Sequence, residues 1–187
     1  MSRVASLQAA AAPEAVRAGR ARVALLLAAI GGAALLLGVL VYLADRRGGS
    51  AVWLPSGAWS QGAATLFGTA GAWLPSFVHP FAFALFTVAL RPVTGAPALR
   101  ICAAWWAVNV VFELGQWPAA AAGIAAALQA GFGQAWPARA LANYFVRGTF
   151  DRVDLLAATA GAVAAAWVIH LVVRPGKGGD PHADDEN

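Results

Sequence analysis

The side chains best placed to do chemistry lie in an apolar stretch of this 187-residue chain, around Glu113. Asn109, Glu113 and Gln116 follow the i, i+4, i+7 spacing that puts side chains on one face of a helix. An ionisable group at membrane depth costs several kcal/mol unless it has a partner, so it marks a functional site by default. Such a carboxylate could exchange a proton with a neighbouring histidine or with a ligand. The sequence therefore predicts a polar site around Glu113.

His79 and Glu113 come from different predicted helices but lie at nearly the same depth. With a rise of about 1.5 Å per residue, Glu113 lies about 20 Å, and His79 about 18 Å, from the basic residues that bound their helices. Asp154 falls at about 30 Å, at the outer boundary, with Asp151 one turn above it. This spacing predicts a pocket that opens outward, with Arg147 and the two aspartates at its mouth. The candidate polar-site residues are His79, Asn109, Glu113, Gln116, Arg147, Asp151 and Asp154.

The composition indicates a membrane protein. Hydrophobic residues make up 60% of the chain and charged residues 12%, whereas a soluble domain carries about 25% charged residues. The mean hydropathy is +0.64. The net charge of +4 is small, and the basic residues lie beside apolar runs and form no stripe. Nucleic acid is therefore not an expected partner.

The sequence offers no motif for metal, redox or covalent chemistry. Cys102 is the single cysteine, so no intrachain disulfide forms. The three histidines have no paired Cys/His spacing, and we expect neither a metal site nor a cofactor. Because no nucleophile motif is present either, the sequence does not assign an enzyme activity.

Four apolar runs are long enough to cross a bilayer, and they predict an all-α, polytopic transmembrane helical bundle. A basic cytoplasmic leader precedes the bundle, which covers residues 23–173, and a polar cytoplasmic tail follows it. The leader covers residues 1–22, the spans lie near 23–43, 74–90, 101–117 and 153–173, and the tail covers 174–187.

Two segments between these spans remain open. Residues 44–73 are rich in Gly, Ser, Pro and Trp, which favours an interfacial or re-entrant loop over a further span. The Ala/Gly-rich residues 118–138 resemble a helical excursion at the membrane surface, with a weak span as the alternative. The basic leader, the 91–100 turn and the basic start of the tail fall on one side if the number of spans is even. The positive-inside bias then predicts that both termini are cytoplasmic.

Three motifs, in order, resemble the VanZ-like family of bacterial integral membrane proteins. Arg147–Ala162, RGTFDRVDLLAATAGA, is similar to the signature that introduces the family's last span. The helix with His79 resembles the family's His-containing helix, and Glu113 with Gln116 resembles its Glu-x-x-Gln helix. Together these motifs cover roughly residues 74–173.

The chain also departs from the family pattern. Ala158 stands where the family usually has an asparagine, Arg147 is spaced differently, and the insert at 118–136 is longer. The resemblance implies a multi-pass protein of the bacterial inner (plasma) membrane, and some relatives are linked to glycopeptide resistance. The residues carried over to the polar site are His79, Glu113, Gln116, Arg147, Asp151 and Asp154.

Three functional hypotheses follow. The first is an outer-leaflet polar site that binds or modifies an envelope lipid or peptide group, with Arg147 holding an anion. The second is a non-catalytic accessory or scaffold subunit, whose charges fix helix packing for a partner membrane protein. The third is a small proton-coupled transporter that uses Glu113 and His79. Each residue also has a structural interpretation: Glu113 could pair with His79 or Arg147, and Asp151 and Asp154 could be charges at a helix N-terminus.

Overall fold

The computed structural model describes residues 2–45, 66–91 and 93–173, with side chains from residue 16 onward. These residues form six helices and no strand in the described ranges. They are α1 (Ser2–Asp45), α2 (Ala70–Leu90), α3 (Ala96–Gly115), α4 (Pro118–Phe132), α5 (Trp136–Arg147) and α6 (Arg152–Val172). Four helices, α1, α2, α3 and α6, are long and apolar enough to cross a membrane. The predicted all-α bundle with four membrane-spanning helices is therefore confirmed.

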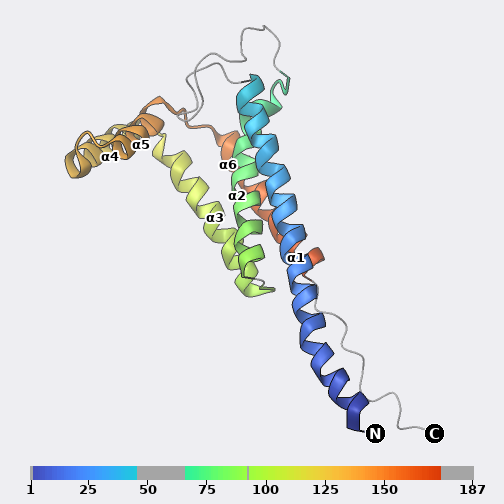
Figure 1. Ribbon diagram of the computed structural model, residues 1–187. Coiled ribbons are helices and arrows are strands. Elements are labelled where there is room, and N and C mark those ends of the chain that lie inside the picture. Colours follow the sequence, from blue (N-terminus) through green and yellow to red (C-terminus); the bar gives the residue numbers. More distant parts are fainter. Residues whose placement is uncertain (1, 46–65, 92, 174–187) are drawn as a thin grey trace.

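The spanning helices alternate in direction, with α2 at the centre of the bundle. It packs against α1 and α6 most extensively, and it also contacts α3, with Val88 and Cys102 in one buried cluster. The end of α2, the start of α3 and the end of α6 therefore lie at one end of the bundle, and the first turns of α1 project beyond that end (Figure 1). At this end the buried core is apolar and includes Leu27, Leu85, Val88 and Ile169. Many large apolar side chains on the outside of the spanning helices are exposed, as lipid contact requires.

Helices α2 and α6 approach closely because a glycine faces a backbone. A Cβ atom added at Gly161 of α6 would overlap the backbone carbonyl of Phe77 on α2. On the same helix the small residues Ala158 and Ala165 are buried. A stripe of small residues lets two membrane helices bring their backbones together, and close packing replaces the hydrophobic effect that lipid cannot supply.

The helix boundaries differ from the predicted spans in α1, α2 and α3. Most of the predicted leader, residues 1–22, belongs to α1, which runs from Ser2 to Asp45 and whose apolar part begins near Val16. The second helix begins at Ala70, earlier than residue 74. The third begins at Ala96 because Gly95, with φ 62, and a proline in the first turn start a helix there. It ends at Gly115, because Pro118 opens the next helix.

The two open segments have different outcomes. Most of residues 44–73 and the tail 174–187 lie outside the described residues, although Asp45 accepts hydrogen bonds from the backbone N–H groups of Leu66 and Phe67. Residues 118–138 contribute to a helical hairpin made of α4 and α5. Both helices are too short to span a bilayer. The hairpin projects sideways from one end of the bundle, and α3 leans away from α2 towards it (Figure 1).

Candidate functional site

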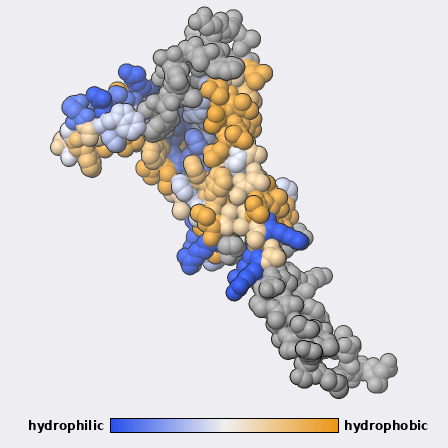
Figure 2. All heavy atoms as spheres, viewed as in Figure 1, coloured by the Kyte–Doolittle hydropathy of each residue, from blue (hydrophilic) through white to orange (hydrophobic). Residues whose placement is uncertain are grey.

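A cavity of about 570 Å³ lies where the hairpin meets the bundle. Its walls come from α1, α2, α3, α5, α6 and the connection that follows α5. Figure 2 shows hydrophilic residues in a recess between the hairpin and the bundle, and hydrophobic residues over the bundle surface. The polar residues that line the cavity are Tyr42, Ser76, His79, Asn109, Glu113, Gln116, Arg139, Asn143, Tyr144, Arg147, Thr149 and Asp154.

Glu113 is buried, with 8% of its surface exposed, in the last turn of α3. Its Oε1 atom accepts a hydrogen bond of 2.7 Å from the backbone N–H of Asp151. Within the described residues this is the one hydrogen bond of the Glu113 carboxylate. Every fully buried side-chain oxygen in that part of the chain has a hydrogen-bond partner. The second Glu113 oxygen, Oε2, is therefore accessible from the cavity. Glu113 both holds the start of α6 and presents a carboxyl oxygen to the cavity.

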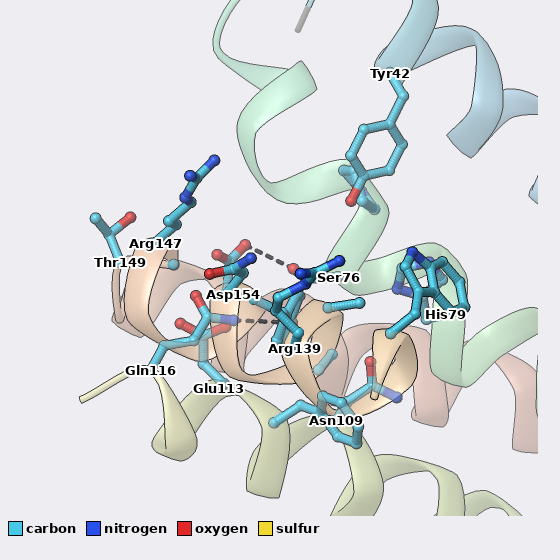
Figure 3. A pocket seen from close by; sticks show the side chains of 18 residues that line it. Tyr42, Ser76, His79, Asn109, Glu113, Gln116, Arg139, Arg147, Thr149 and Asp154 are labelled. Atoms are coloured by element: carbon cyan, nitrogen blue, oxygen red, sulfur yellow. Dashed lines mark hydrogen bonds between the residues drawn. The ribbon is translucent and has the colours of Figure 1, made fainter. Parts of the chain in front are cut away.

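A second carboxylate, Asp154, comes from the first turn of α6. Its Oδ1 atom accepts a hydrogen bond of 2.8 Å from the hydroxyl of Ser76 on α2. His79 lies one turn further along α2, and its ring stacks on Phe83 with a centroid distance of 6.1 Å. Figure 3 shows Asp154 and Ser76 near the centre of the cavity wall, with Glu113 and His79 to either side. Helices α3 and α6 thus supply the two carboxylates of the acidic wall, and α2 supplies Ser76 and His79.

Helix α5 supplies the basic wall. Arg139, Asn143 and Arg147 are spaced four residues apart, so they lie on one face of this strongly amphipathic helix, and all three line the cavity. In the described part of the chain neither guanidinium group forms an ion pair with a carboxylate. Charged residues of both signs therefore line one cavity.

The two walls meet at a hydrogen bond and an aromatic cluster. Gln116 donates from Nε2 to the hydroxyl of Tyr144 at 2.9 Å. Phe112 contacts the ring of Tyr144 at 5.7 Å and that of Phe145 at 5.6 Å between centroids. A Cβ atom at Gly115 would press on the Phe145 ring, so the glycine lets α5 sit close to the end of α3. These contacts hold the hairpin against α3.

Six of the seven predicted site residues line this cavity: His79, Asn109, Glu113, Gln116, Arg147 and Asp154. The seventh, Asp151, does not line the cavity, but its backbone N–H donates to Glu113. Its side chain accepts a hydrogen bond of 2.8 Å from the N–H of Val153 and caps α6. The amide nitrogen of Asn109 bonds to the carbonyl of Trp105 in its own helix, so it is held by α3 itself. The structural interpretation of Asp151 as a helix-terminal residue thus agrees with this geometry.

Sequence reasoning did not find Tyr42, Ser76, Arg139, Asn143, Tyr144 or Thr149. One signal was available: arginines at i and i+8 with an asparagine midway, in a chain where charged residues are few. Such a pattern predicts an amphipathic helix with a single basic face. The contributions of Ser76 and Tyr42 carry no comparable signal, because each is an isolated polar residue near the end of an apolar helix.

Replacing Asp151 by alanine is expected to destabilise the protein by about 0.5–2 kcal/mol, the usual cost of losing a helix N-cap. Asp151→Asn keeps an oxygen acceptor for the Val153 N–H and should stay close to wild type. Thermal unfolding in detergent measures both variants. Equal destabilisation by the two substitutions would show that the charge matters and the cap does not.

The hydroxyl of Tyr144 is expected to ionise at a higher pH than a free tyrosine. Partial burial first, and then the negative charge of Glu113, raise the pKa of Tyr144 above its ordinary value near 10, while the hydrogen bond from Gln116 opposes the shift. Glu113→Gln removes the negative charge and should therefore lower the pKa of Tyr144. The chain has two tyrosines, so the alkaline ultraviolet difference between wild type and Tyr144→Phe isolates this group. If the Tyr144 pKa is the same in Glu113→Gln as in wild type, the charge of Glu113 does not act on the Tyr144 hydroxyl.

Comparisons of the chain with protein-family models, with curated proteins and with solved structures each find no match. The resemblance to the VanZ-like family therefore rests on the three motifs alone. Within the described residues, the fold establishes a helical bundle with four helices long and apolar enough to cross a membrane, and a polar cavity at one end of them.

Proposed function

We propose that this protein binds the polar group of an envelope lipid or peptide in the cavity between α5 and the bundle, at the outer face of a bacterial inner membrane. The observation that carries the proposal is the pair of cavity arginines, Arg139 and Arg147, which are not used in ion pairs within the described residues. Guanidinium groups bind phosphate and carboxylate in a bidentate manner. The VanZ-like motifs support the same class of protein.

The distribution of basic residues supports an outward-facing cavity. Arg17, Arg20, Arg22, Arg91 and Arg100 belong to the bundle end opposite the cavity. The positive-inside bias makes that end cytoplasmic. The cavity end also carries arginines, but two of these face the cavity, where a ligand accounts for them. Both ends of the bundle sequence would then be cytoplasmic.

The packing favours binding over proton-coupled transport. Away from the cavity, the space between α1, α2, α3 and α6 is filled by apolar side chains such as Leu27, Leu85 and Ile169. A proton or solute route needs polar groups or water along its length. The polar groups of the cavity are instead gathered at one end of the bundle, as a binding site at the membrane surface requires.

Loss of the two cavity arginines tests the proposal. We expect the Arg139→Gln/Arg147→Gln double variant, purified as the full chain in mild detergent, to retain at least tenfold less phospholipid than wild type in native mass spectrometry. The matched control is Arg20→Gln/Arg22→Gln, which removes two exposed arginines from α1 and should retain lipid normally. Equal retention by both double variants would contradict a headgroup site in this cavity.

A further inference from the structure

The cavity holds opposite charges on opposing walls, and this arrangement limits the chemistry of its ligand. Glu113 and Asp154 belong to the bundle wall, and Arg139 and Arg147 belong to α5. A purely anionic ligand would meet the arginines but be repelled by the carboxylates, and a purely cationic ligand would face the reverse problem. The penalty is larger at Glu113, which is buried, than at Arg139 and Arg147, which are exposed. A ligand that carries both charges satisfies both walls.

The two walls are also linked at a short distance. Tyr144 and Gln116 join through a hydrogen bond of 2.9 Å. Arg147 follows Tyr144 by one helical turn on α5, and Glu113 precedes Gln116 by one turn on α3. Arg147 and Glu113 therefore belong to neighbouring turns on either side of this bond. A ligand that carries both charges can contact α3 and α5 where the two helices meet.

Resting on the proposed function, we propose that the ligand of this cavity is the headgroup of an aminophospholipid, with its phosphate at Arg139 and Arg147 and its primary ammonium at Glu113 and Asp154. The accessible Oε2 of Glu113 accepts an N–H of the ammonium, while Oε1 keeps its bond to the Asp151 backbone. Carboxylates favour a primary ammonium over a quaternary one, because only the former donates hydrogen bonds.

The surroundings favour a lipid over a peptide. The cavity lies at the end of helices whose outer faces are apolar, and next to it Phe112, Trp117 and Trp136 are exposed. Aromatic rings of this kind occupy the interface between lipid and water. The exposed apolar side chains Val108 and Val111 continue along α3 below the cavity. Acyl chains can lie along this surface while the headgroup enters the cavity. The volume of about 570 Å³ also falls within the usual range for small-ligand sites, about 300–1,000 Å³.

The test compares lipids with identical acyl chains and different headgroups, bound to the full chain in detergent. We expect wild type to bind phosphatidylethanolamine at least tenfold tighter than phosphatidylglycerol or phosphatidylcholine. Glu113→Gln should lose this preference while its affinity for phosphatidylglycerol stays unchanged. Asp154→Asn, which keeps an acceptor for Ser76, should weaken the preference in the same direction. The second variant decides the matter if the first fails to fold.

Other outcomes overturn the inference in distinguishable ways. If phosphatidylglycerol or phosphatidylcholine binds as tightly as phosphatidylethanolamine, recognition of a primary ammonium is refuted, but a headgroup site remains. Displacement of phosphatidylethanolamine by a free dipeptide, and not by glycerophosphoethanolamine, would identify a peptide ligand instead. If none of these lipids or soluble compounds binds, the proposed function fails together with the inference.

Discussion

Glu113→Ala is expected to weaken both the stability and the ligand binding of this protein. Removal of the side chain leaves the part-buried N–H of Asp151 without its acceptor. A buried donor that loses its partner costs about 1–3 kcal/mol, and partial burial places this site towards the lower end. The same substitution removes one of two carboxylates from the cavity wall. The midpoint of thermal unfolding and lipid binding, both measured in detergent, report the two effects separately.

Glu113→Gln separates these roles. Its amide oxygen still accepts from the Asp151 N–H, so stability should stay near wild type, while the negative charge is lost. Asn109→Ala is the matched control on α3, because the Asn109 amide nitrogen bonds to the Trp105 carbonyl of its own helix and its loss should change stability little. If Gln destabilises the protein as much as Ala does, the hydrogen bond to the α6 connection is not what Glu113 contributes.

Gly161→Ala is expected to destabilise the bundle by about 1–3 kcal/mol, the usual cost of overpacking a well-packed core. The added methyl group meets the backbone carbonyl of Phe77, which cannot rotate away as a side chain would. Helices α2 and α6 must therefore separate, and Ser76 and Asp154 lie on these same two helices. We expect a lower unfolding midpoint in detergent and weaker lipid binding together.

Gly32→Ala is the control for this substitution. Gly32 also lies within a spanning helix, but a Cβ atom there meets nothing within 4 Å. Since alanine is a better helix former than glycine, Gly32→Ala should be neutral or slightly stabilising. Equal destabilisation at both positions would show that the loss at Gly161 comes from the helix itself and not from its contact with α2.

The spans and the central site residues could be predicted because long-range rules govern them. Apolar runs of this length have few alternatives to a membrane helix. The constant rise of a helix then placed His79 and Glu113 at similar depths and Asp154 nearer the outer boundary. The structure brings all three to one cavity. The direction in which these side chains point could not be predicted from spacing. It depends on how the helices pack around Gly161.

The hairpin and the basic wall could not be predicted in the same way. Ten of the fifteen residues of α4 are Ala or Gly, so its apolar periodicity is weak, and Pro118 and Gly133 mark the helix ends without indicating direction. The position of α5 depends on Phe112, Tyr144 and Phe145, which are aromatic residues with many possible neighbours. Asp151 was ambiguous because an aspartate at a helix N-cap and an aspartate in a site look alike in a sequence.

Photochemical capture of the ligand tests the headgroup site most directly. A photo-crosslinking amino acid at Ala140, which lines the cavity between the two arginines, should form a phosphatidylethanolamine adduct in bacterial membranes. The yield should fall at least tenfold when Arg139 and Arg147 are both replaced by glutamine, and remain unchanged in the Arg20→Gln/Arg22→Gln control. The absence of a lipid adduct, or an adduct indifferent to the cavity arginines, would contradict the account.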